Sequence, residues 1–161
     1  MAHDLMGMPW RRRKPYLAIF WGGLIAGTLD ILSAFLILTK PGFGPMRLLQ
    51  GIASGLLGRS SFSGGWKTAA LGLVCHFAIA FGAAAAYVAV SRKMRVLVQR
   101  PVICGLLYGI PVYLVTNFVV VPLSKIGMRP IGPLSGVALG LGILMVLVGL
   151  PIGLATRRFV G

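Results

Sequence analysis

Long apolar runs alternate with short polar or basic segments along this chain. A helix needs about 20 apolar residues to cross the hydrocarbon core of a bilayer. Four runs reach that length: residues 16–38, 66–90, 102–122 and 134–156. Prolines and glycines between the runs, as in Lys40-Pro41-Gly42, end one helix before the next begins. The pattern predicts an all-α integral membrane four-helix bundle, with residues 1–161 forming a single transmembrane domain.

A shorter run at residues 45–58 has a different pattern. It places apolar residues on one helical face (Met46, Leu49, Ile52, Ala53 and Leu56) and polar residues on another (Arg47, Gln50 and Ser54). This spacing is typical of an amphipathic helix, and the run is too short to span a bilayer. We therefore expect a short interfacial amphipathic helix between the first two spans.

Composition agrees with a lipid environment. Hydrophobic residues make up 57% of the chain and charged residues only 11%, which leaves too little polar surface to coat a water-soluble protein. The 16 Lys and Arg against 2 Asp and Glu give a net charge of +14. Because these basic residues lie between and outside the apolar runs, anionic lipid head groups explain them, and we expect no nucleic-acid partner.

The distribution of basic residues predicts the orientation. Ten flank the runs on the side of the two termini and six lie on the other side, so the positive-inside rule places both termini in the cytoplasm. Seven of these residues are the expected contacts to lipid head groups: Arg11, Arg12, Arg13, Lys14, Arg92, Lys93 and Arg95.

Three polar residues lie inside the predicted spans, where they are costly without a partner. Asp30, His76 and Asn117 all fall in the half of the membrane opposite the termini, with Thr116 and Tyr113 close to Asn117 in the sequence. One hypothesis is a polar site in which Asp30 accepts a proton or cation, His76 is its partner and Asn117 guides by hydrogen bonding. The alternative is that the same residues only hold the helices together.

His76 allows one further hypothesis. A membrane histidine four residues after a glycine, Gly72, could ligate a haem or a chlorophyll-type magnesium, because the glycine leaves room for a flat macrocycle. Nothing else in the sequence points to a tetrapyrrole, and no cluster of metal ligands is present in it. We therefore expect neither a cofactor nor a metal ion.

Small residues recur at four-residue spacing within the spans. Such spacing lets helix backbones approach closely, and six glycines are the expected packing positions: Gly23, Gly27, Gly105, Gly109, Gly136 and Gly140. Ala78, Gly82 and Ala86 repeat the spacing in the second span. The chain has no glutamate, nucleophile motif or phosphate-binding glycine loop, so we expect no enzymatic activity.

The third span carries a resemblance. Gly105-Leu106-Leu107-Tyr108-Gly109, then Asn117-Phe118-Val119-Val120-Val121-Pro122-Leu123, followed by a glycine-rich last span, resembles the YagU-like family of small bacterial inner-membrane proteins of unknown function. The resemblance covers mainly residues 102–156. It implies a multi-pass protein of the bacterial inner membrane and supplies no activity.

Two functional hypotheses follow from these patterns. The first is a non-enzymatic accessory or scaffolding subunit that packs against other membrane proteins, or against a second copy, through its glycine-rich faces. The second is a small carrier or proton-coupled conduit that uses Asp30, His76 and Asn117.

Overall fold

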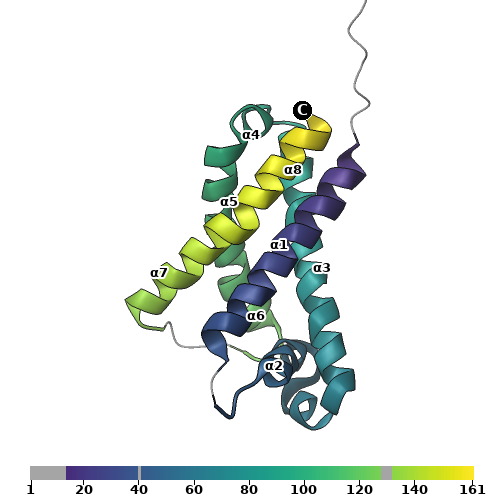
Figure 1. The fold of residues 1–161 in the computed structure, drawn as a ribbon, viewed down its shortest axis with the longest axis vertical. Coiled ribbons are helices and arrows are strands. Elements are labelled where there is room, and N and C mark those ends of the chain that lie inside the picture. Colours follow the sequence, from purple (N-terminus) through teal and green to yellow (C-terminus); the bar gives the residue numbers. More distant parts are fainter. Residues whose placement is uncertain (1–13, 40, 128–131) are drawn as a thin grey trace, which may run out of the picture.

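A computed structural model describes residues 14–39, 41–127 and 132–161. Throughout these residues the regular structure is helical, which confirms the all-α prediction. Four helical stretches are long and apolar enough to cross a membrane: Pro15–Leu38, Gly65–Ser91, Pro101–Leu123 and Leu134–Val160. They run along one another as a bundle (Figure 1), and they overlap the four predicted spans.

The two halves of the chain differ in regularity. The first span is one helix, α1 (Pro15–Leu38), and the second is one helix, α3 (Gly65–Ser91). Between them lie α2 (Pro45–Leu57) and a 3₁₀ turn, η1 (Gly58–Ser63). A short helix, α4 (Val96–Gln99), leads to the third span, which comprises α5 (Pro101–Val115), the π-helical turn η2 (Thr116–Val120) and α6 (Val121–Leu123). The fourth comprises α7 (Leu134–Ile143), the π-helical segment η3 (Leu144–Gly149) and α8 (Leu150–Val160).

The helices pack unevenly around the bundle. α1 packs along both α3 and α8, and α5 packs along η3 and α8, whereas α3 and α5 scarcely contact each other. α4 and the C-terminus lie at one end of the bundle, and α2 lies at the other (Figure 1). We call these the α4 end and the α2 end. One side of the bundle, between α3 and α5, is therefore weakly closed.

Prolines explain both irregular segments. Proline lacks the N–H that would bond the carbonyl four residues earlier. The helix widens just before Pro122 and Pro151, where Val121 N–H bonds Thr116 O and Leu150 N–H bonds Met145 O, five residues back. Another proline of these spans, Pro111, lies inside the continuous helix α5.

Glycines set the closest helix contacts. A Cβ on Gly27 would lie 2.8 Å from the ring of Phe77 in α3, and one on Gly23 would meet Phe81. On α5, a Cβ on Gly105 would lie 2.8 Å from the carbonyl oxygen of Gly149, and one on Gly109 would meet the backbone of Met145. Because these contacts involve backbone atoms, α5 can approach the fourth span only with glycine at these positions.

Other small residues do not pack as predicted. Gly136 is exposed, and a Cβ there would meet only the ring of Pro133, at 3.9 Å, among the described residues. Gly140 faces the ring of Tyr113, 3.3 Å from a Cβ, and so packs on a side chain. Ala78, Gly82 and Ala86 are exposed on α3. The four-residue spacing alone does not distinguish a face that meets a helix of the same chain from one that faces outward.

The amphipathic helix α2 is present, but its buried face differs from the prediction. Gln50 and Ser54, expected on the polar face, are buried together with Leu48 and Ala53. Gln50 Nε2 donates to the Gly65 carbonyl at 3.1 Å, which satisfies the buried amide. α2 sits directly on Gly72 of α3, where a Cβ would clash with the Leu49 carbonyl. The sequence pattern predicts the helix correctly. Which face is buried follows from the hydrogen bond between Gln50 and Gly65, the first residue of α3.

Candidate functional site

A partly open cavity of about 450 Å³ lies within the bundle toward the α2 end, and we call it the central cavity. Its walls come from all four spans and from α2. Most lining side chains are apolar, and the polar exceptions are Asp30, His76, Thr116 and Ser124. A mainly apolar cavity with a few convergent polar groups is the usual form of a small-molecule site.

Asp30 is the acidic group of this cavity. It lies on α1 and is partly buried, in a chain that has only two acidic residues. Gly27 and Ile31 line the cavity beside it. A carboxylate in apolar surroundings attracts positive charge strongly, so Asp30 gives the cavity a group that could hold a cation or a proton.

His76 faces the same cavity from α3. Its Nε2–H donates to the Gly27 carbonyl at 2.8 Å, and its ring packs edge-on against Phe77. The bond joins α3 to α1 three residues before Asp30 and leaves Nδ1 as the free ring nitrogen. The structure therefore brings Asp30 and His76 to one cavity, with His76 bonded to the backbone of α1.

The residues around His76 do not fit a tetrapyrrole. Nε2 is occupied by the bond to Gly27. The backbone of α2 at Leu49 fills the space above Gly72 that a flat macrocycle would need. Among residues 14–39, 41–127 and 132–161, no group of three or more His, Cys, Asp or Glu side chains could hold a metal ion.

Replacing His76 with alanine should weaken the contact between α3 and α1. Hydrogen bonds between membrane helices contribute on average about 0.6 kcal/mol, with an upper value near 1.7 kcal/mol, so we expect a destabilisation in that range. Unfolding in mixed micelles with increasing dodecyl sulfate, followed by circular dichroism, measures it. His76→Gln keeps an N–H donor and should recover part of the loss. Equal losses for both variants would contradict a role for this hydrogen bond.

Of the three residues predicted in the third span, the structure places one in the cavity. Thr116 lines it, but Asn117 is exposed and donates from Nδ2 to the Tyr113 carbonyl at 3.0 Å. Tyr113 faces Gly140 instead. Neighbouring residues of a helix point in different directions, and here Thr116 faces the cavity while Asn117 faces outward. The predicted convergence of Asn117 with Asp30 and His76 is wrong, and the candidate site residue Tyr113 does not line the cavity either.

Sequence reasoning missed Ser124 and the contribution of α2. Ser124 follows α6, lines the cavity, donates to the Val121 carbonyl at 2.6 Å and accepts a bond from Ile126 N–H at 3.2 Å. The backbone of the next residue, Lys125, also bonds the carbonyl of Gly55 in α2, at 2.8 Å. Only the bond from Lys125 to Gly55 is long-range; it joins this turn to α2 beside the cavity, and no local sequence pattern indicates it.

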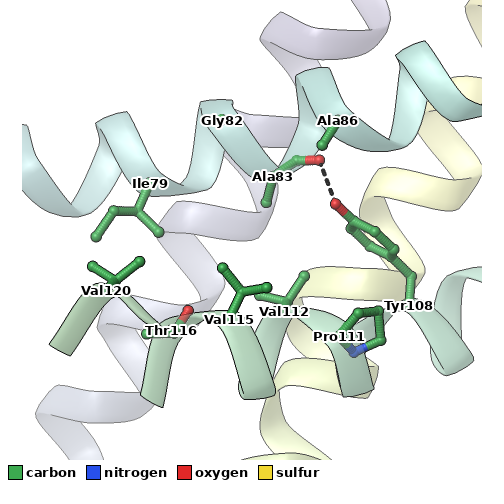
Figure 2. A pocket seen from close by; sticks show the side chains of 10 residues that line it. All are labelled: Ile79, Gly82, Ala83, Ala86, Tyr108, Pro111, Val112, Val115, Thr116 and Val120. Carbon is green, nitrogen blue, oxygen red and sulfur yellow. Dashed lines mark hydrogen bonds between the residues drawn. The ribbon is translucent and has the colours of Figure 1, made fainter. Parts of the chain in front are cut away.

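A second, smaller hollow of about 320 Å³ lies between α3 and α5, and we call it the lateral groove (Figure 2). Gly82, Ala83 and Ala86 line it on α3, and Pro111, Val112 and Val115 line it on α5. Tyr108 borders it and donates from its hydroxyl to the Ala83 carbonyl at 2.9 Å (Figure 2). Its walls are almost wholly apolar.

The basic residues assigned to lipid head groups gather at the α4 end. Lys14 precedes α1, and Arg92, Lys93 and Arg95 lie between α3 and α4; all four are exposed. Exposed Arg157 and Arg158 lie in the last turn of α8, at the same end. Arg11, Arg12 and Arg13 lie outside the described residues.

Comparisons of the chain with protein-family models, with curated proteins and with solved structures gave no match.

Proposed function

We propose that this polytopic membrane protein is a small non-enzymatic carrier that binds an organic cation in its central cavity, with Asp30 as the counter-ion. The observation that supports this most directly is the placement of Asp30 and His76 in one cavity whose walls come from all four spans. All of the residues that line this cavity belong to a single copy of the protein. A volume of about 450 Å³ suits a drug-sized molecule.

Proton exchange would couple to binding at this site. A protonated carboxyl group no longer attracts a cation, so one proton arriving at Asp30 releases what the carboxylate holds. His76 lines the same cavity, and its bond to the Gly27 carbonyl leaves the Asp30 carboxylate to the ligand. We therefore favour the carrier or proton-coupled conduit, with Thr116 taking the place that the sequence assigned to Asn117.

The basic residues at the α4 end support an orientation of the protein in the membrane. The exposed basic residues between α3 and α4 lie at the α4 end, together with Arg157 and Arg158. The positive-inside rule then places the α4 end, with both termini, in the cytoplasm and the central cavity toward the opposite face of a bacterial inner membrane.

An accessory role is the second candidate, and α7 favours it. This helix has no buried residue, and Leu134 and Leu139 are exposed, beside the open Gly136. Such a face could pack against another membrane protein. Purification in mild detergent separates the two proposals: a fixed-stoichiometry complex with other subunits favours the accessory role, and an isolated chain favours the carrier.

Binding of tetraphenylphosphonium tests the carrier proposal. We expect the purified protein to bind this lipophilic cation saturably at neutral pH in equilibrium dialysis, and to release it on acidification. Tetraphenylborate has nearly the same shape and the opposite charge, so it serves as the matched control. Equal binding of both ions, or binding that does not saturate, would rule out a counter-ion site in the cavity.

A further inference from the structure

We propose that the lateral groove is the route by which the ligand reaches the central cavity from the bilayer, and that the ligand is a single-chain amphiphile. Its alkyl chain lies between α3 and α5 and its ammonium group reaches Asp30. This inference rests on the proposed cation site and adds to it the ligand class and the direction of access.

The seam between α3 and α5 is held at one end by tyrosines. Tyr108 bonds the carbonyl of Ala83, and its ring packs edge-on against Tyr87 with centroids 4.9 Å apart. Tyr87 in turn donates to the Leu97 carbonyl of α4 at 3.1 Å. These contacts tie α3, α4 and α5 together toward the α4 end. The lateral groove lies beside these contacts, and Tyr108 and Ala83 are part of its lining.

Small side chains keep the groove open. A Cβ on Gly82 would meet no other described atom within 4 Å, so α3 is not packed against α5 here. Pro111, Val112 and Val115 form the facing wall (Figure 2). A groove with almost wholly apolar walls, inside a membrane span, matches the chemistry of an alkyl chain better than that of a polar molecule.

The groove and the central cavity share a wall. Five residues line both: Ile79, Ala83, Val112, Thr116 and Val120. Asp30 and His76 stand on the far side of that wall, in the central cavity. A molecule that lies across the shared wall therefore has its apolar part between α3 and α5 and its polar end beside a carboxylate. Charge complementarity selects an ammonium group for that end.

Filling the groove tests its role without touching the cavity. Gly82 lines the groove but not the central cavity, so Gly82→Trp should reduce binding of a long-chain alkylamine at least tenfold and leave tetraphenylphosphonium binding unchanged. Gly142→Trp is the matched control, because no other described atom lies within 4 Å of a Cβ there either and it lines neither hollow. Unchanged alkylamine binding in Gly82→Trp would overturn the groove proposal. Absent tetraphenylphosphonium binding in the unmodified protein would instead overturn the carrier proposal.

Photo-crosslinking locates the alkyl chain of the ligand in the unmodified protein, so the result does not depend on whether a variant folds. An alkylamine with a diazirine in mid-chain, added to the unmodified protein in vesicles, should label α3 around Ala83 and Ala86 and α5 around Val112 and Val115. Excess unlabelled alkylamine should compete this labelling away. Labelling spread evenly over the outward faces of all four spans would overturn the groove proposal.

Discussion

Replacing Gly109 with leucine is expected to separate the third and fourth spans and to cost about 3 kcal/mol or more of unfolding free energy, because overpacking at a backbone contact cannot be relieved by a rotamer change. Even a Cβ at this position would overlap the backbone of Met145. Next to it, a Cβ on Gly149 would lie 2.9 Å from the amide nitrogen of Gly109, so the two backbones are in direct contact and a larger side chain on either must push them apart.

Gly142→Leu provides the control for this prediction. Gly142 lies in α7 of the same fourth span, is exposed, and has no other described atom within 4 Å of a Cβ. Leucine has a higher helix propensity than glycine, so this variant should be neutral or more stable by up to about 1 kcal/mol. Dodecyl sulfate titration in mixed micelles compares the two. Equal stability of both variants would show that the contact of α5 with η3 does not hold the bundle together.

The spans could be predicted because their signal is local. An apolar run between Lys14 and Thr39 has no stable alternative to a helix in lipid, where each backbone N–H and C=O must be bonded within its own segment. Pro15 and Pro101 begin helices for an equally local reason, since proline at the first helical position loses no bond. Such features depend on the residue and its immediate neighbours.

The site was predictable only in part, because the direction in which a side chain faces depends on packing between segments that are distant in the sequence. Asp30 and His76 belong to one cavity since Gly27 lets α3 approach α1. Thr116 rather than Asn117 faces inward, and the widened turn η2 that begins at Thr116 adds a residue to the helical repeat. Counting positions along a regular α-helix therefore does not predict which of these side chains faces the cavity. The burial of Gln50 likewise follows from a bond to Gly65, fifteen residues away.

Asp30→Asn should remove cation binding from the central cavity. Truncating one partner of a desolvated charge pair costs about 2–5 kcal/mol, and each 1.4 kcal/mol is about tenfold in affinity, so we expect tetraphenylphosphonium affinity to fall at least about 30-fold. Asn has nearly the same shape as Asp, so the cavity keeps its volume. Asp4→Asn, which removes the only other acid of the chain, should bind the cation like the unmodified protein.

The stability of Asp30→Asn decides between a binding site and a structural bond between helices. His76 bonds the Gly27 carbonyl rather than the Asp30 side chain. In the carrier, a carboxylate in these apolar surroundings therefore destabilises the fold until a cation binds to it. Asn at position 30 should then leave the unfolding free energy of the empty protein unchanged or raise it, while cation binding is lost. If Asp30 instead joined the helices, the variant would unfold more easily, and its folded fraction would bind the cation like the unmodified protein.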